Sequence, residues 1–172
     1  SSNRKILSLA EKFPEIKAAL GIYPVNALAL TAKQLDEEIK FIEKNKDKII
    51  SVGEVGLDYQ ESDNAEKQKE ILIRFIKLSN KLNKPLTIHS RKAERECVAL
   101  LEEHKAKKVL MHHFAGRLTM VNQIVKNGWF LSIPSSIEYS EHFQQMVKRT
   151  PLSNLLCETD SPFLHPERKM NN

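Results

Sequence analysis

Acidic, imidazole and guanidinium side chains recur just after short apolar runs of this sequence. They are Glu54, Asp58, His89, Arg91, His112 and Asp160. Imidazole and carboxylate are ligands that zinc, manganese and related divalent ions take in proteins. A divalent ion at such a site polarises a phosphoryl oxygen and lowers the pKa of bound water to about 7. The set of residues therefore indicates metal-assisted hydrolysis.

Three of these residues also have an ordinary structural explanation. His89 could be only a hydrogen-bonding residue at a strand end, Asp160 could only make a turn, and Glu54 could only form a salt bridge. In the pair His112-His113, adjacent side chains point to opposite faces of a strand, so alternation leaves open which one reaches a site. The coincidence across four segments carries more weight than any single residue.

Strand and helix patterns alternate along the chain, and the candidate residues fall at the carboxyl ends of the strands. We expect strands at 17–22, 49–55, 86–89, 108–113, 129–133 and 155–159, and helices at 3–13, 32–45, 64–82, 93–104, 118–126 and 140–149. Thr31 is a plausible cap for the second helix, and Asn127-Gly128 ends the fifth. The alternation predicts a parallel sheet with helices outside it and ligands at the carboxyl ends of its strands.

The expected number of strands leaves two α/β architectures open. A closed barrel of this type has eight strands, whereas an open doubly wound sheet can use six. No glycine-rich phosphate loop follows an early strand, and this absence disfavours the doubly wound sheet.

Composition indicates one globular domain covering residues 1–172, with 41% hydrophobic and 28% charged residues. No apolar run approaches the roughly 20 residues of a membrane span, and no signal core opens the chain, so we expect a cytoplasmic protein without a membrane partner. Cys97 and Cys157 lie in apolar surroundings, which predicts two buried thiols. The net charge of +5 suits a polyanion such as DNA, although solvated lysine faces explain it equally well.

Five segments in order resemble the TatD-type deoxyribonucleases of the amidohydrolase-like, metal-dependent hydrolase superfamily. They are ALGIYP at 19–24, GEVGLDY at 53–59, IHSR at 88–91, HHFAG at 112–116 and ETDSPFL at 158–164. The resemblance implies a (β/α)8 TIM-type barrel with one or two divalent metal ions (Mg, Mn or Zn). It also implies hydrolysis of phosphodiester bonds, typically as a 3′-to-5′ DNA exonuclease.

The same resemblance implies a role for each matching residue. The metal ligands would be Glu54 as the bridging carboxylate, His89, His112 and Asp160. Glu54 and Asp160 would be the catalytic pair, with Asp160 holding or deprotonating the attacking water. His112 takes the ligand position because the family pattern is His-Cys-Phe-x-Gly, in which His113 stands at the Cys position.

Substrate binding is implied for Tyr23, Arg91 and Asp58. Tyr23 is a departure, because the family usually has a histidine there that contacts the substrate phosphate. A tyrosine hydroxyl can donate one hydrogen bond but carries no positive charge. The replacement of histidine by Tyr23 therefore leaves the substrate preference and the rate undetermined.

A second departure is the absence of the family's His-x-His, which belongs to its first strand. The chain would then lack the first two strands and the C-terminal end of the barrel. Two alternatives remain. One is an amidohydrolase-like barrel acting on an ester, lactone or amide, and the other is a truncated or degenerate binding protein without catalysis.

Overall fold

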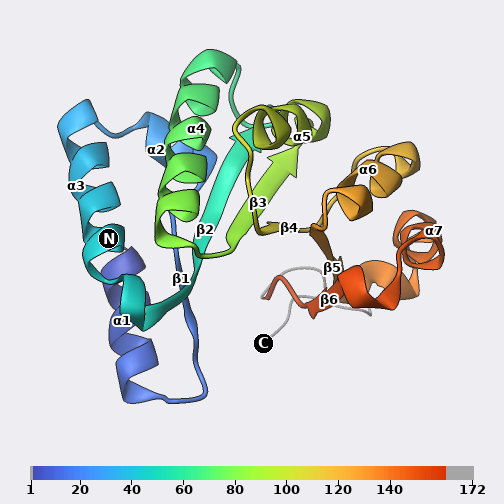
Figure 1. Cartoon of the computed structure of the whole chain (residues 1–172), viewed down its shortest axis with the longest axis horizontal. Coiled ribbons are helices and arrows are strands. Elements are labelled where there is room, and N and C mark those ends of the chain that lie inside the picture. The colour runs from blue at the N-terminus through green and yellow to red at the C-terminus, as the bar shows by residue number, and fades with distance from the viewer. Residues whose placement is uncertain (1, 162–172) are drawn as a thin grey trace. The chain divides into compact units, whose positions relative to one another are not determined.

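The computed structural model describes residues 2–161, and the chain separates into two compact units. The first unit ends at Val109 and the second begins at Leu110. Each unit alternates strands with helices (Figure 1). The prediction of a single domain over residues 1–172 stays a prediction.

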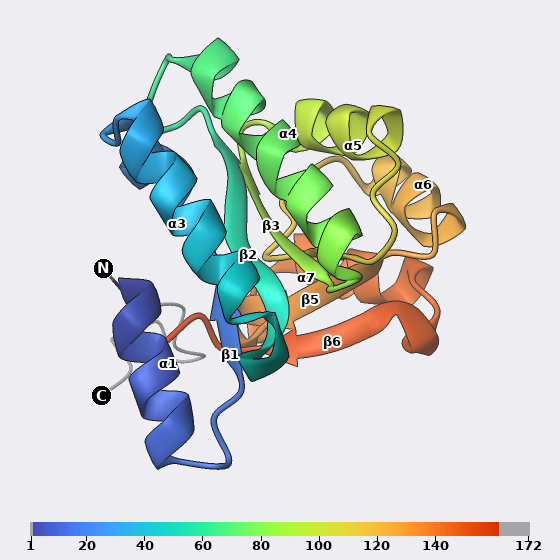
Figure 2. The ribbon, with the colours of Figure 1, turned by 60° about the vertical axis from the view of Figure 1, so that its left-hand side comes forward.

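The first unit carries three parallel strands that pair in chain order, β1-β2-β3. Its elements are α1 (Ser2–Lys12), β1 (Ala18–Leu20), α2 (Pro24–Leu28), α3 (Ala32–Lys44), a 3-10 turn (Lys46–Lys48), β2 (Ile49–Asp58), α4 (Ala65–Leu82), β3 (Leu86–Arg91) and α5 (Glu94–Glu103). Figure 2 shows α3 and α4 side by side, with α4 packed on β2.

The second unit repeats the arrangement, with β4, β5 and β6 parallel and again in chain order. Its elements are β4 (Val109–Met111, which starts at the boundary), α6 (Val121–Lys126), β5 (Phe130–Pro134), α7 (Glu141–Arg149) and β6 (Leu155–Glu158), with 3-10 turns at Leu118–Met120, Ser135–Glu138 and Leu152–Asn154. Chain-order pairing is typical of a (β/α) barrel, because a doubly wound sheet reverses its strand order at a switch point.

Local sequence signals explain where several helices begin and end. Thr31 caps α3 as predicted: its hydroxyl accepts from the Gln34 backbone N–H, and the Gln34 side chain accepts from the Thr31 N–H. Asn127 ends α6, and Gly128 follows with φ +72°. The sequence analysis missed α2, whose signal was Pro24 at the first helical turn.

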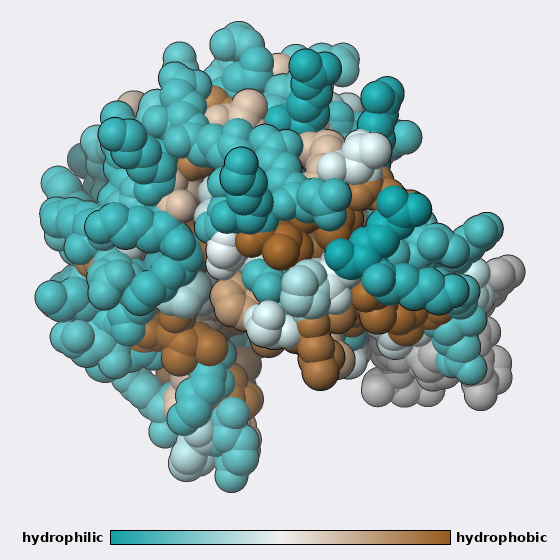
Figure 3. Space-filling view, turned by 45° about the vertical axis from the view of Figure 1, so that its right-hand side comes forward, coloured by the Kyte–Doolittle hydropathy of each residue, from teal (hydrophilic) through white to brown (hydrophobic). Residues whose placement is uncertain are grey.

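The apolar faces of strands and helices make the core of each unit. In the first unit, Leu72, Phe75 and Ile76 of α4 are completely buried, as are Val52 and Leu57 of β2. Hydrophilic side chains cover much of the face drawn in Figure 3. Among residues 2–161, no helix has both the length and the apolar character needed to cross a membrane.

Two sequence expectations need correction. Strand β2 extends to Asp58 rather than ending at residue 55, because Val55, Leu57 and Asp58 continue to pair with β3. The prediction that both cysteines are buried is wrong for Cys157, which is exposed, although both thiols are free. Strand β6 is the last in the strand order and pairs only with β5 in this unit, so part of its side-chain row stays accessible.

Gly56 allows β2 and β3 to approach closely. It has φ +150°, and a Cβ atom built on it would lie 1.9 Å from the carbonyl oxygen of His89. The same strand pair places Gly56 opposite His89 and Asp58 opposite Arg91. Any side chain at position 56 must therefore push β3 away or break this register.

Helix α1 is held in the first unit by polar contacts near its start. Glu38 of α3 accepts from Arg4 Nη1 at 2.5 Å and from Asn3 Nδ2 at 3.2 Å. The Asn3 side-chain oxygen in turn accepts from the Gly21 backbone N–H at 3.3 Å. Burial alone would raise the pKa of Glu38, but the hydrogen bonds from Arg4 and Asn3 lower it below its ordinary value.

We predict that Gly56→Ala lowers the free energy of unfolding by roughly 3 kcal/mol or more, because the methyl group has no space against β3. Gly128→Ala is the matched control. It also stands at positive φ but has nothing within 4 Å of its built Cβ, so it should cost only about 1–2 kcal/mol. Urea denaturation of both variants measures the difference. Equal losses would contradict the close-approach explanation.

We predict a pH-dependent effect for Glu38→Gln. The folded-state pKa of Glu38 is lowered, so its contribution is present above its unfolded pKa of about 4.3 and is lost as pH falls through the folded value. The variant should be about 0.5–1 kcal/mol less stable than wild type at pH 7, and the gap should close below about pH 4. Denaturation curves across pH test this, with exposed Glu37→Gln as the control. A gap that persists in acid would contradict it.

Candidate functional site

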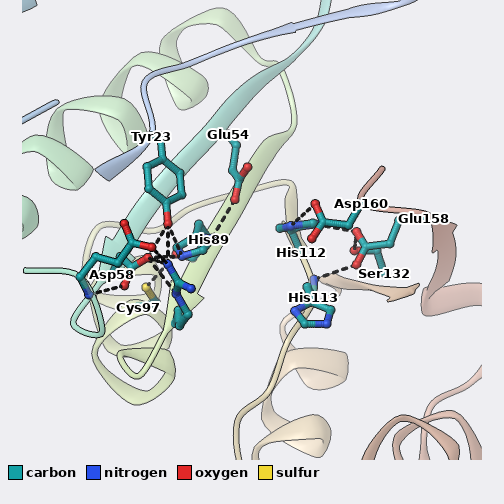
Figure 4. Close-up of polar contacts among 12 residues, drawn as sticks. Tyr23, Glu54, Asp58, His89, Cys97, His112, His113, Ser132, Glu158 and Asp160 are labelled. Atoms are coloured by element: carbon teal, nitrogen blue, oxygen red, sulfur yellow. Dashed lines mark hydrogen bonds and ion pairs between the residues drawn. The ribbon is translucent and has the colours of Figure 1, made fainter. Parts of the chain in front are cut away.

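Strands β2 and β3 carry the candidate residues of the first unit. Because Gly56 pairs with His89 and Asp58 with Arg91, and side chains alternate along a strand, these positions share one face of the pair. Glu54 lies where the register shifts between Val52 and Val55, and its carboxylate reaches His89 on that same face. Figure 4 shows the side chains of Glu54, Asp58 and His89 directed toward one another.

The ring of His89 lies between two carboxylates. Its Nδ1 atom is 2.8 Å from Glu54 Oε1, and its Nε2 atom is 3.0 Å from Asp58 Oδ2. The side chain is 15% exposed, and the ring of Tyr23 meets it edge-on with a centroid separation of 4.9 Å. Both ring nitrogens are thus engaged, each by a different acid.

Asp58 is a buried carboxylate surrounded by donors. Its side chain is 0% exposed, and Oδ2 accepts from the Tyr23 hydroxyl and from Arg91 Nε and Nη2, the last two at 3.0 and 2.7 Å. Burial alone would raise the pKa of Asp58, but hydrogen bonds from Arg91 and Tyr23 hold it well below its usual range. Asp58 is therefore ionised at neutral pH.

Arg91 and Tyr23 complete this network. The Arg91 side chain is 43% exposed and also pairs with Glu61, while its Nη2 donates to the Tyr23 hydroxyl at 3.1 Å. Burial and the hydrogen bond to Asp58 raise the pKa of Tyr23. Tyr23 is thus a neutral phenol whose proton is donated to Asp58.

In the second unit, His112 also lies beside two carboxylates. Its Nδ1 is 2.5 Å from Glu158 Oε2, and its Nε2 is 3.7 Å from Asp160 Oδ1. Glu158 further accepts from the Ser132 hydroxyl at 2.5 Å and from the His113 backbone N–H at 3.1 Å. Burial alone would raise the pKa of Glu158, but the hydrogen bonds from His112 and Ser132 lower it.

The two adjacent histidines have different surroundings. The ring of His113 packs against Phe143 with a centroid separation of 5.0 Å. His112, by contrast, faces the acidic residues Glu158 and Asp160 (Figure 4). Geometry thus separates two residues that strand alternation alone could not.

Imidazole nitrogen and carboxylate oxygen, the donor types present in both units, are those that divalent metal ions take in proteins. Within either unit, the described residues form no group of three His, Cys, Asp or Glu side chains that could hold an ion. Each unit offers one imidazole beside one candidate carboxylate: His89 with Glu54, and His112 with Asp160. In both, the other ring nitrogen is hydrogen-bonded to a second acid. That is the arrangement which orients histidine ligands in metal proteins.

Sequence reasoning placed the main candidate residues but missed some of their partners. The structure brings Glu54, His89, Asp58, Arg91 and Tyr23 together in the first unit, and His112 and Asp160 in the second. Three partners were missed: Glu61, Ser132 and the bonding role of Glu158. Ser132 had a visible signal, because it is the lone polar residue within the apolar run of β5. Pro162, Phe163 and Leu164 of the last motif lie outside the described residues.

Parallel strands that pair in chain order and alternate with helices define an α/β protein of the (β/α) barrel class. The chain belongs to the TatD related DNase family, which it matches over residues 1–172. The expected family and fold class are thereby confirmed.

Individual relatives agree with this assignment. The chain is 40% identical over 180 residues to the deoxyribonuclease TATDN3 of Homo sapiens, covering 98% of this chain and 66% of that protein. It is 32% identical over 177 residues to YabD of Bacillus subtilis, an uncharacterised metal-dependent hydrolase, covering 98% and 68%. The crystal structure of YJJV, a TatD homologue from Escherichia coli, matches with a TM-score of 0.88 at 27% identity, covering 98% of this chain and 68% of that one. The chain thus spans about two thirds of the length of these relatives.

We predict that Ser132→Ala destabilises the protein by about 1–3 kcal/mol, because the partly buried Glu158 carboxylate loses a hydroxyl donor. Ser132 is 1% exposed, so water cannot easily replace the hydroxyl. Ser153→Ala, a change at an exposed serine of the same unit, serves as the control and should stay within about 0.5 kcal/mol. Urea denaturation measures the free energy of unfolding of both variants. An unchanged value for Ser132→Ala would show that the hydroxyl does not stabilise Glu158.

Proposed function

We propose that this chain supplies catalytic residues of a metal-dependent phosphodiester hydrolase that cleaves DNA in the 3′-to-5′ direction. The observation that carries the proposal is the paired arrangement of two histidines, each between a candidate ligand carboxylate and a second acid. Such pairs favour metal ligation over a purely structural role, since second acids orient ligand histidines. Family membership supports the choice of DNA as substrate.

Four residues are proposed as metal ligands: Glu54 as the bridging carboxylate, His89, His112 and Asp160. Magnesium, manganese and zinc all suit this mixture of carboxylate and imidazole. A bound divalent ion would supply positive charge that polarises the phosphoryl oxygen and acidifies water.

Asp160 is proposed to handle the proton of the attacking water. Its side chain is 39% exposed and faces His112 Nε2 at 3.7 Å, so an oxygen of this carboxylate is accessible to a water molecule. The carboxylate would accept a hydrogen bond from one O–H group of the water and would take that proton as the water oxygen bonds to phosphorus. The P–O bond to the departing sugar oxygen would break in the same step, and that oxygen would take a proton from solvent. Glu54, beside His89, is proposed to share the catalytic role through its charge.

Arg91 is proposed to contact the substrate phosphate. It is always charged and partly exposed, and its guanidinium geometry suits phosphate oxygens. Tyr23 and Asp58 would contribute to substrate binding by holding Arg91, because the Tyr23 proton and the Asp58 oxygens already engage this network. The net charge of +5 also suits a DNA partner. The cytoplasmic location expected from the sequence stays a prediction.

We predict that hydrolysis of single-stranded DNA stops with a chelator and returns with added manganese or magnesium. Glu54→Ala and His89→Ala should each lower the rate by about a hundredfold or more, since a metal supplies several kcal/mol of transition-state stabilisation. Glu54→Ala should weaken metal binding most if it bridges two ions. Oligonucleotides labelled at either end report the direction of cleavage.

The control is Glu103→Ala, an exposed acid at the end of α5, which should leave rate and metal content unchanged. Melting curves recorded beside the assays separate lost chemistry from lost folding. Undiminished DNA cleavage in chelator, by protein free of metal in elemental analysis, would refute the metal mechanism. Faster turnover of small esters, lactones or amides than of DNA would favour the amidohydrolase alternative.

A further inference from the structure

Arg91 contacts two carboxylates that differ sharply in burial. The Asp58 side chain is 0% exposed, whereas the Glu61 side chain is 51% exposed. Asp58 Oδ1 is held by the backbone N–H groups of Gln60 and Glu61 at 3.0 and 3.1 Å. Within residues 2–161, the Glu61 carboxylate is hydrogen-bonded to Arg91 alone. One carboxylate is therefore built into the turn that follows β2, and the other rests on Arg91 from the solvent side.

Asp58 occupies one edge of the Arg91 guanidinium group. Nε and Nη2 both donate to Asp58 Oδ2, at 3.0 and 2.7 Å. A guanidinium group has two edges that can donate a pair of parallel hydrogen bonds to an anion, one formed by Nε with Nη2 and one formed by Nη1 with Nη2. Because a buried carboxylate takes the first edge, a phosphate can receive two parallel bonds only at the Nη1–Nη2 edge.

Glu61 holds half of that second edge. Nη2 carries two hydrogens, one directed to the Nε side and one to the Nη1 side. The first serves Asp58 and the Tyr23 hydroxyl, which is itself directed at Asp58 (Figure 4). The second is left for Glu61 Oε1, which pairs with Nη2. A phosphate that binds both nitrogens of this edge must therefore replace the Glu61 carboxylate.

We propose that Glu61 is a displaceable counter-anion of Arg91, and that a DNA phosphate binds by taking its place on the Nη1–Nη2 edge. The proposal rests on the proposed function for the contact between Arg91 and phosphate. It goes further by assigning control of DNA affinity to Glu61. An exposed ion pair contributes little free energy, so the exchange is easy. The Glu61 side chain can rotate into water while its backbone N–H stays bound to Asp58.

The experiment measures the affinity of the full chain for DNA by fluorescence anisotropy of a labelled single-stranded oligonucleotide, in chelator so that the DNA is not cut. Arg91→Gln should raise Kd about tenfold or more, because a charge-assisted contact is lost. Glu61→Gln should lower Kd about two- to fivefold, the range that an exposed ion pair is worth. In the Arg91→Gln background, Glu61→Gln should lose most of this gain, because the edge that it uncovers no longer exists.

Cleavage assays with manganese give a second measurement. Glu61→Gln should lower KM about two- to fivefold, because removing a competing ligand strengthens substrate binding before and during the reaction alike. The value of kcat should stay within about twofold of wild type. Glu70→Gln is the matched control, since it removes one negative charge from an exposed acid of α4 in the same unit. It should change neither Kd nor KM.

The outcomes separate the two proposals. Wild-type Kd and KM in Glu61→Gln, beside weakened binding in Arg91→Gln, would overturn the role of Glu61 and keep the phosphate contact of Arg91. An equal gain from Glu61→Gln with and without Arg91 would also overturn it, because such a gain reports general charge repulsion. Unchanged DNA binding in Arg91→Gln, or wild type that neither binds nor cuts DNA, would instead refute the proposed function on which the inference rests.

Discussion

The register between β2 and β3 decides which side chains meet in the first unit. Gly56 lies opposite His89, and Asp58 lies opposite Arg91. Alternation of side chains then puts Asp58 at one nitrogen of the His89 ring, and the register shift between Val52 and Val55 leaves Glu54 at the other. A slip of one residue would turn the whole set to the opposite face. Stability and the candidate chemistry therefore depend on the same strand pairing.

A carboxylate that is buried in the first unit and partly buried in the second serves each unit in the same physical way. An isolated charge inside a protein is costly, so a buried acid persists only among donors. Asp58 and Glu158 each gather several donors, and one of those partners is a histidine ring nitrogen. Because each carboxylate requires hydrogen-bond donors, its contact with the histidine ring also fixes the orientation of that ring. The two units thus hold a histidine ring by the same kind of contact, across neighbouring strands β2 and β3 in the first unit and across β4, β5 and β6 in the second.

The spacing of apolar residues predicted all six strands of the described part of the chain. A strand or helix that buries one face repeats its apolar residues at a fixed interval, and this interval can be read from the sequence. It also singled out Glu54, His89 and His112 as candidates, because each lies near the end of an apolar run in the sequence. The bond of Ser132 to Glu158 was not predictable, because contacts across strands depend on register. The exposure of Cys157 was missed for a related reason: an apolar neighbourhood in the sequence does not reveal which face of an outer strand is covered. The complete burial of Asp58 was not predictable either, because it depends on the side chains that pack around it from other parts of the chain.

The two cysteines differ in a way that has a practical use. Cys97 is completely buried, and burial raises the pKa of its thiol, so it offers almost no thiolate to a reagent. Cys157 is free and exposed on β6, next to Glu158. A maleimide or iodoacetamide reagent would therefore attach to one position of the native chain without prior mutagenesis. A fluorophore or spin label at that thiol would report on the second unit from β6, the strand that also carries Glu158.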